Sequence, residues 1–120
     1  MLSLPSTVRI YLCVQPADMR RGFDGLAQLT TQLIGEDPLS GHFFVFRNRR
    51  CDRLKVLYWD RDGYAVWAKR LERGTFRFPE LSGDRLEVSP AELAAILGGI
   101  DLKTAKRQRR FSLPTAACAV

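Results

Sequence analysis

One stretch of the chain, residues 43–59, constrains the fold more than any other. It contains two runs rich in aromatic and β-branched residues, 43–46 and 54–59, with a short polar segment between them. Asn48 and Asp52 supply turn-forming side chains in that segment. Because two such runs joined by a short turn pair with each other, the stretch predicts an antiparallel β-hairpin.

The turn of this predicted hairpin is strongly cationic. It carries Arg47, Arg49, Arg50 and Arg53. A guanidinium group offers a planar fork of donors that matches phosphate oxygens, so a hairpin with an apolar base could present several forks to a polyanion. The alternative is that these arginines form a solvated turn that prevents strand aggregation.

The composition bounds the size and class of the protein. A chain of 120 residues is long enough for one domain with a core, and 46% hydrophobic with 27% charged residues is typical of globular proteins. The 19 Lys and Arg residues, 15 of them arginine, outnumber the 13 Asp and Glu residues and give a formal net charge of +6. This balance favours a polyanionic partner, although a genome rich in G and C would also encode many arginines.

Cysteine usage and hydropathy exclude several classes. Cys13, Cys51 and Cys118 are odd in number and never at Cys-x-x-Cys spacing, so neither a disulfide framework nor a zinc knuckle is expected. The amino terminus lacks the basic start and long apolar run of a signal peptide. No apolar run approaches the ~18 residues of a membrane span. We therefore expect a cytoplasmic protein with no membrane partner.

The first part of the chain predicts a strand followed by a helix. Residues 8–14 are rich in β-branched and aromatic side chains, and Pro16 ends the run. Asp18 could cap a helix whose apolar residues fall at helical spacing, with Gly35 just past its end.

The start of this helix is unusual in its glycines. Gly22 and Gly25 would each cost about 1 kcal/mol relative to alanine inside a helix, so they indicate a later start or a close approach of another group to the backbone. Arg20 and Arg21 lie beside them, and near a helix amino terminus they are candidate phosphate contacts.

Residues 63–73 fit two structures. Helical spacing, a possible cap at Asp60 or Asp62, a basic last turn and the stop at Gly74 predict a short helix. Alternating apolar residues in the same segment would also permit a strand, joined to the preceding one by an Asp-Gly turn. We prefer the helix.

The rest of the fold is predicted as two strands and a helix. Residues 75–78 and 85–88 read as short strands. Ser89 and Glu92 form a capping box, with proline at the first helical position, and predict a helix that ends at Gly98.

The end of the chain is basic. Residues 103–110 carry five positive charges and no negative charge. We expect a single domain over residues 1–102, followed by a flexible tail over 103–120 that could follow a phosphate backbone. Many basic tails only solvate a terminus, and this alternative stays open.

Few residues indicate catalysis. His42 is the single histidine, and no second histidine or well-placed cysteine completes a metal site. Asp60 and Asp62 follow a predicted strand, where a two-metal site would place carboxylates, but beside Gly63 they equally describe a helix cap or a turn. We expect no catalytic residue, no metal and no cofactor.

Four separated blocks of sequence carry a resemblance to a known family. They are residues 18–26 (DMRRGFDGL), 37–50 (DPLSGHFFVFRNRR), 52–60 (DRLKVLYWD) and 69–79 (KRLERGTFRFP). In order and spacing, from about residue 8 to residue 110, the chain resembles the TnpB accessory proteins of the sixty-six family of bacterial insertion sequences. These proteins are distinct from the RNA-guided nuclease that shares their name.

The resemblance implies a small protein encoded beside a separate, larger transposase that carries the catalytic acidic residues. It implies a need for this protein in efficient transposition and no activity of its own. Ala68, where the family more often has a larger residue, and Cys51, where it more often has glycine, depart from the family pattern.

Together these features predict an α+β domain in which a small, mostly antiparallel sheet with an arginine-tipped hairpin packs against two or three helices. The expected function is that of a non-catalytic accessory protein in DNA transposition that binds the ends of the insertion sequence. The alternative is an interaction module that binds the transposase, with Trp59 or Trp67 as an anchor. The predicted DNA contacts are Arg20, Arg21, Arg47, Arg49, Arg50, Arg53, Lys106, Arg107, Arg109 and Arg110.

Overall fold

The predicted hairpin lies in the middle of the sheet. β2 (Phe43–Arg47) pairs antiparallel with β3 (Arg53–Asp60), and β3 pairs antiparallel with β4 (Gly63–Arg70). Each strand thus returns alongside its predecessor after a short turn.

Two further strands complete the sheet. The computed structural model describes residues 7–79, 85–99 and 108–113. Within these residues the sheet has five strands in the order β4-β3-β2-β1-β5. β1 (Ile10–Cys13) lies parallel to β2, and β5 (Arg85–Val88) pairs antiparallel with β1. The predicted strands at 8–14 and 85–88 are therefore confirmed, the first over fewer residues.

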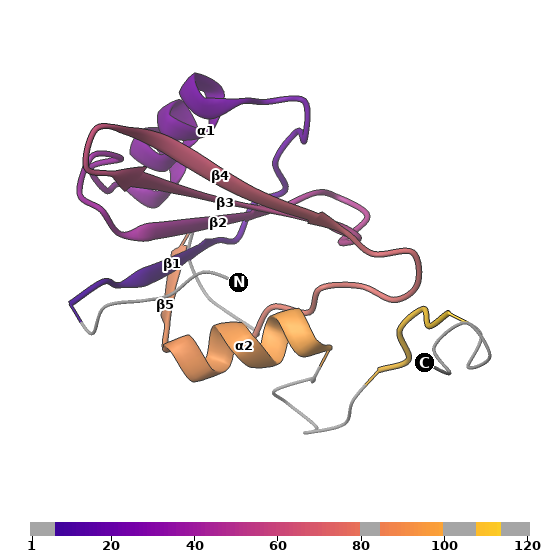
Figure 1. The fold of residues 1–120 in the computed structure, drawn as a ribbon. Helices are drawn as coiled ribbons and strands as arrows, with labels where there is room; N and C mark the ends of the chain where they lie inside the picture. Colours follow the sequence, from indigo (N-terminus) through magenta and orange to yellow (C-terminus); the bar gives the residue numbers. More distant parts are fainter. Residues whose placement is uncertain (1–6, 80–84, 100–107, 114–120) are drawn as a thin grey trace.

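Helices cover both faces of the sheet (Figure 1). α1 (Phe23–Leu29) continues as a π-helical segment, η1 (Thr30–Ile34), and connects β1 to β2. Parallel neighbours need a crossover of this kind, since a tight turn cannot join them. α2 (Pro90–Gly98) packs on the opposite face. The α+β fold with a mostly antiparallel sheet is confirmed.

The two layers explain why β2 is apolar along almost its whole length. Phe44 and Phe46 face α1 and η1, whereas Phe43 and Val45 face α2. A strand covered on both faces has no polar side, so it reads as a continuous hydrophobic run.

The two helix starts differ in how well they were predicted. The capping box at Ser89 is present: its Oγ accepts a hydrogen bond from the Glu92 backbone N–H at 3.1 Å, and the Glu92 carboxylate accepts one from the Ser89 N–H at 3.0 Å. Asp18 does not cap α1, which begins later, after Gly22. Gly25 also allows a close approach, because a Cβ there would lie 3.0 Å from the Cβ of Arg21.

The prediction of a helix over 63–73 is wrong, because β4 occupies most of that segment. Asp60 pairs with Gly63 across the two-residue turn of Arg61 and Asp62, and Arg61 adopts a left-handed φ of 55°. Hairpin turns of two residues use positive φ because their twist then matches that of the strands. Pairing along the whole of β3 outweighs the weak helical pattern.

The predicted strand over 75–78 is also wrong. These residues follow β4 without strand pairing, and Phe76 lies fully buried in the core on the α2 side. The Phe76 N–H donates to the Cys51 carbonyl at 2.7 Å, so this segment is hydrogen-bonded to the turn between β2 and β3. In the part of the chain that the structure describes, no helix has the length and apolar character needed to cross a bilayer.

Replacing Phe44 by alanine should destabilise the fold strongly. Its side chain is fully buried and stacks on Tyr11, with ring centroids 5.9 Å apart. Truncation of a buried phenylalanine costs about 3–5 kcal/mol, because it removes apolar contacts and leaves a cavity. Urea denaturation measures the loss, and Leu39→Ala, at a side chain that is 52% exposed, is the matched control and should change stability little. Equal losses for both variants would contradict the two-layer core.

Candidate nucleic-acid interface

Hydrogen bonds within the turn between β2 and β3 fix its shape. Cys51 has a left-handed φ of 64° and donates its N–H to the Asn48 carbonyl at 3.0 Å. The Asn48 side chain donates to the Asp52 carboxylate at 2.7 Å and accepts from the Arg53 N–H at 2.9 Å. The predicted turn residues Asn48 and Asp52 thus close the loop themselves.

The same turn is tied to the segment after β4. The Asp52 carbonyl accepts a hydrogen bond from the Leu71 N–H at 2.7 Å, and the Cys51 carbonyl accepts the one from Phe76. Backbone bonds on both sides leave the turn little freedom to move. It is a stiff support for the side chains that it carries.

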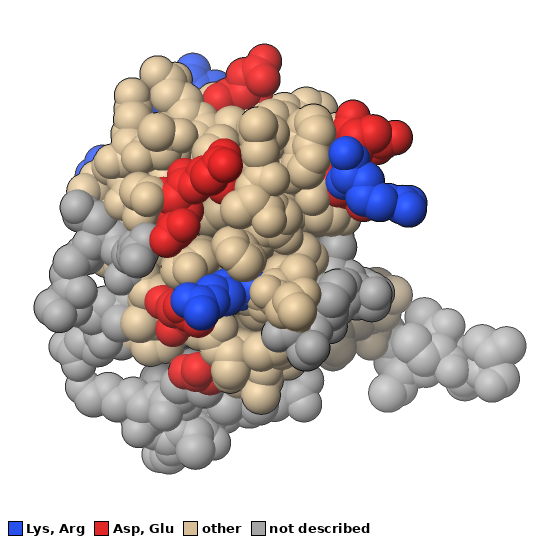
Figure 2. All heavy atoms as spheres, turned by 90° about the vertical axis from the view of Figure 1, so that its left-hand side faces the viewer, with Lys and Arg blue, Asp and Glu red and all other residues tan. Residues whose placement is uncertain are grey.

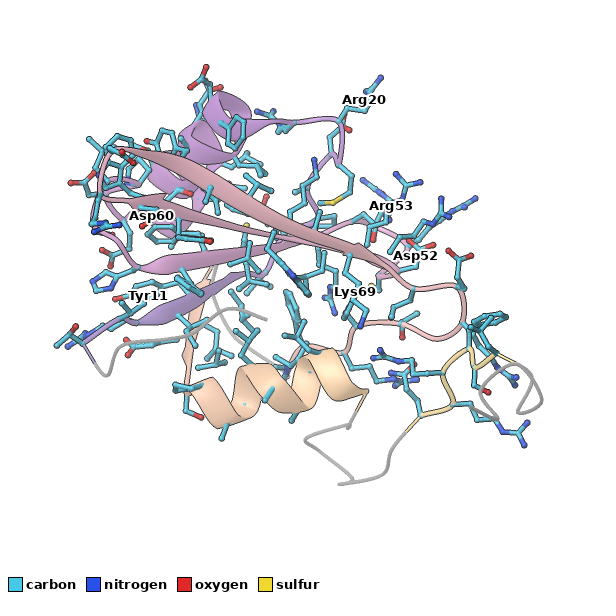
Figure 3. The ribbon with its side chains drawn as sticks, in the orientation of Figure 1. Tyr11, Arg20, Asp52, Arg53, Asp60 and Lys69 are labelled. Carbon is cyan, nitrogen blue, oxygen red and sulfur yellow. The ribbon has the colours of Figure 1, made fainter. Side chains whose placement is uncertain are left out.

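Three of the four predicted hairpin arginines project from this support into solvent. Arg49, Arg50 and Arg53 are exposed, and none forms an ion pair with a carboxylate among the described residues. Arg53 lies at the same end of the sheet as Arg20 (Figure 3).

Arg47 has a different position. Its guanidinium donates to the Phe76 carbonyl at 2.9 Å and lies 4.0 Å from the centre of the Phe78 ring. The side chain is half-buried, and this burial lowers the pKa of Arg47. The structure therefore places Arg47 inside the fold, away from the other three arginines.

The loop before α1 brings Arg20 and Arg21 to the hairpin turn. The Lys55 ammonium on β3 donates to the carbonyls of Met19 and Arg21 at 2.8 and 3.0 Å. The Ala17 N–H donates to the Arg47 carbonyl at 2.9 Å. Three hydrogen bonds thus hold the loop against the end of the hairpin.

Arg20 is oriented by Asp18. Its side chain donates through Nε and Nη2 to the carboxylate, at 2.7 Å for the shortest contact, and its backbone N–H donates at 2.9 Å. These bonds lower the pKa of Asp18 from 3.8 to about 2, and the side-chain bonds contribute more than the backbone bond. The Arg20 side chain is 92% exposed, so it stays accessible to a ligand despite the pair.

Two adjoining hollows join these segments. One of about 420 Å³ lies between the loop and the hairpin turn, and Arg20, Arg49 and Arg50 line it together with Arg53. The second, of about 530 Å³, is lined by Arg53, Lys69 and Arg70. Because Arg53 lines both, the cations form one surface, which we call the basic end. Its members are Arg20, Arg49, Arg50, Arg53, Lys69 and Arg70, together with Arg21, which lines a third hollow of about 380 Å³ beside Arg49.

Carboxylates are present at the basic end, but they are engaged. Asp18 binds Arg20, and Glu72 accepts from Arg70 at 2.9 Å. Asp52 accepts the hydrogen bond from Asn48. Because that amide is neutral, the Asp52 carboxylate keeps its charge. Among the described residues of the basic end, it is outnumbered by the cations that have no carboxylate partner, which are Arg21, Arg49, Arg50, Arg53 and Lys69.

Lys69 and Arg70 were not among the predicted contacts. The helix prediction assigned them to a basic last helical turn, whereas the register of β4 places Arg70 opposite Arg53 and Lys69 opposite Leu54. Two signals in the sequence could have placed Lys69 and Arg70 beside the hairpin. They are the alternation of apolar residues in the segment 63–70 and the Asp-Gly pair, which favours a hairpin turn.

The opposite end of the sheet carries acidic residues. Asp60 ends β3, and Asp62 lies in the exposed turn that follows, where Arg61 Nε is 4.0 Å from the Asp60 carboxylate. Partial burial and the nearby carboxylates of Asp37 and Asp24 raise the pKa of Tyr64. Figure 2 shows this end, and most of the charged side chains on view are acidic. Charge is thus segregated along the strands.

The predicted contacts in the tail are only partly described. Lys106 and Arg107 lie outside the described residues, and Arg109 is exposed. Gln108 exchanges two hydrogen bonds with the backbone of Thr75, at 2.7 and 2.6 Å. Arg110 donates to the Leu97 carbonyl at the end of α2, at 3.2 Å. The described part of the tail thus packs against the domain, and the boundary at residue 102 stays a prediction.

The described residues hold no grouping of three or more His, Cys, Asp or Glu side chains that could bind a metal ion. Asp60 ends β3 and Asp62 lies in the turn that follows, in line with the turn that the sequence offered as an alternative to a metal site. His42 accepts a hydrogen bond from the Arg9 N–H at 3.0 Å beside the start of β2.

Replacing Arg20 by alanine should raise the pKa of Asp18 from about 2 toward 3.8, because the carboxylate would lose its main donors. The measurement is an NMR titration of the Asp18 carboxyl carbon. Since the folded pKa is depressed, the stability that the pair contributes is present above about 3.8 and is lost as the pH falls through about 2.

Arg21→Ala is the control for that titration. Arg21 donates to the Gly25 carbonyl at 3.4 Å, and its charge makes the smallest contribution to the lowered pKa of Asp18, so its loss should move that pKa only slightly. An Asp18 pKa near 3.8 in the unmodified protein would contradict the arrangement of the loop.

Comparison with known proteins gives one family and two relatives. A family model described as IS66 Orf2 like protein matches residues 8–107. The uncharacterized protein y4jC of Sinorhizobium fredii (strain NBRC 101917 / NGR234) is 42% identical over 101 residues, which cover 84% of this chain and 86% of y4jC. The uncharacterized protein y4hO of the same strain is 40% identical over 101 residues, 84% of this chain and 88% of y4hO. No solved structure is detectably similar to the chain.

Proposed function

The chain belongs to the family of IS66 Orf2-like proteins, and from this premise we propose that it assists transposition by binding the DNA of the element's ends through the basic end. The family has an accessory role in IS66 transposition, which suggests a non-catalytic protein. A DNA-binding accessory protein needs a cationic surface that can contact several phosphates at once, and the basic end is such a surface.

The observation that carries the proposal is the convergence of arginines from separate segments. Arg20 comes from the loop before α1, Arg49 and Arg50 come from the hairpin turn, and Arg53 begins β3. They line a single hollow, and the three hairpin arginines have no carboxylate partner among the described residues. Simple solubilisation does not require such convergence.

The chemistry of these groups suits the DNA backbone. Arginine can donate two parallel hydrogen bonds to one phosphate, and its weak hydration lowers the cost of releasing water. Arg20 uses Nε and Nη2 on Asp18 and keeps both N–H groups of Nη1 and one of Nη2 for a ligand. Because phosphate contacts position a protein without reading sequence, we expect binding that depends strongly on salt.

Arg47 is not part of this proposed interface. Its guanidinium is held by the Phe76 carbonyl and the Phe78 ring, so turning it outward would break both contacts. Arg47 instead supports the turn end of the hairpin from below, where β2 ends. Lys106 and Arg107 stay candidates from the sequence alone.

Replacing Arg49 and Arg50 together by alanine should lower the slope of log affinity against log salt by roughly two, because each phosphate contact contributes about 0.9 to the slope. The measurement is a fluorescence titration of the whole protein with DNA of the element's ends at several salt concentrations.

The matched control removes two arginines from the acidic end. Arg9→Ala with Arg61→Asn lowers the net charge by the same amount, and asparagine tolerates the left-handed φ of 55° at position 61. This variant should keep the slope of the unmodified protein. Equal slopes for all three proteins would remove the hairpin turn from the interface.

The alternative is that the protein binds the transposase without touching DNA. Trp59 and Trp67 would then act as anchors, but Trp59 packs edge-on against Tyr64 at 5.1 Å, and Trp67 packs against the core on the α2 side. The large apolar side chains that are most exposed are others, among them Phe23 and Leu39, each 52% exposed. Absence of DNA binding at low salt, together with co-purification with the transposase, would favour this alternative.

A further inference from the structure

β4 is an edge strand of the sheet, and its outer side is open. It lies at one end of the strand order, beyond β3. None of the described backbone groups forms a hydrogen bond with its outer side. An edge of this kind presents a row of N–H and C=O groups that another strand can pair with.

The register shows which groups face outward. Asp60 and Gly63 pair across a two-residue turn, so this pair exchanges both of its hydrogen bonds, and in an antiparallel ladder alternate pairs then do the same. The N–H and C=O groups of Ala65, Trp67 and Lys69 therefore face β3. Those of the intervening residues face outward, and these residues are Tyr64, Val66, Ala68 and Arg70.

The edge also lacks the usual protections against pairing. β4 has eight residues, contains no proline, and pairs with β3 residue for residue without a bulge. Residues 64–68 are all apolar or aromatic, and only the last two residues of the strand are charged. The other edge strand, β5, has only four residues. A long unprotected edge is a site for strand addition.

We propose that β4 pairs antiparallel with β4 of a second copy of the chain and joins the two sheets into one. This inference goes beyond the proposed DNA contact and does not depend on it. Pairing about a two-fold axis is self-complementary, because each copy offers the same edge.

The charges at the two ends of β4 favour a second copy of the chain as the partner that pairs with its open edge. Lys69 and Arg70 make one end positive, whereas Asp60 and Asp62 outnumber Arg61 in the turn at the other end. Antiparallel pairing brings the positive end of each strand beside the acidic turn of the other. Opposite charges across the interface select this orientation over a parallel one.

The dimer leaves the hairpin arginines of the basic end accessible, whereas Lys69 and Arg70 lie beside the acidic turn of the second copy. Pairing uses the backbone of β4, whereas Arg49 and Arg50 project from the turn at the other side of β3. The two basic ends then lie at opposite ends of the joined strands, about 27 Å apart or more for strands of this length. Each copy can thus contact its own stretch of DNA.

Amide hydrogen exchange followed by NMR tests the pairing at single residues. In a monomer the N–H groups of Ala65 and Trp67 are protected by β3, and those of Val66 and Ala68 exchange fast. As the protein concentration rises, protection of Val66 and Ala68 should increase in step with the dimer fraction from sedimentation. The proposal would be overturned if the protein stayed monomeric at every concentration and Val66 and Ala68 kept exchanging fast. Protection of these amides by a segment of the transposase would not rescue it.

A charge exchange tests the orientation. Lys69→Glu with Arg70→Glu places like charges beside Asp60 and Asp62 and should raise the dimer dissociation constant by about tenfold or more. Adding Asp60→Lys and Asp62→Lys to the same chain should restore the dimer.

Arg49→Glu with Arg50→Glu is the matched control, because it changes the net charge equally but lies away from β4. It should leave the dissociation constant unchanged while abolishing DNA binding, so that failure of one proposal is distinct from failure of the other. Equal weakening by both double variants, or no rescue by the charge exchange, would contradict the antiparallel arrangement.

Discussion

The basic end depends on one lysine that joins two segments distant in sequence. Lys55 lies on β3, half-buried, and its ammonium is held by the carbonyls of Met19 and Arg21. A charged group that is partly withdrawn from water needs such partners, and here the partners belong to the loop that carries Arg20. The loop is thereby fixed beside the hairpin turn, so the guanidinium groups of Arg20 and Arg53 face the same hollow. Without this contact the loop and the hairpin would be two separate cationic features.

Holding several like charges together is unfavourable in the free protein, and hydrogen bonds of the turn keep these charges together against their repulsion. The hairpin turn is closed by Asn48 and tied by two backbone bonds to the chain after β4. A surface that is already ordered loses little conformational entropy when a ligand binds, so more of the electrostatic attraction appears as affinity. Asp60 and Asp62 lie at the far end of β3, so the two ends of the sheet differ in charge. A polyanion would therefore attract the basic end and repel the acidic one, which orients the molecule as it approaches.

The sequence predicted the parts of the fold that local chemistry determines. The hairpin at 43–59 and the capping box at Ser89 need only neighbours in sequence, and both are present. Two segments, 63–73 and 75–78, were assigned wrongly because their structure depends on distant partners. β4 has a pattern that fits both periods, and pairing with β3 decides between them. Arg47 follows the alternation of β2 onto the α2 side, where Phe76 and Phe78 receive it, and no local signal in the sequence shows that contact.

The change of β4 from a predicted helix to a strand links the two proposals. As a strand it carries Arg70 to a position opposite Arg53, which extends the basic end, and it leaves its outer backbone open to a second copy. The two uses are compatible, because successive side chains of a strand point to opposite faces while strand pairing lies in the plane of the sheet. A helix over the same residues would satisfy its own backbone groups and would offer no edge. The same hydrogen-bonding register that places the cations therefore also makes self-association possible.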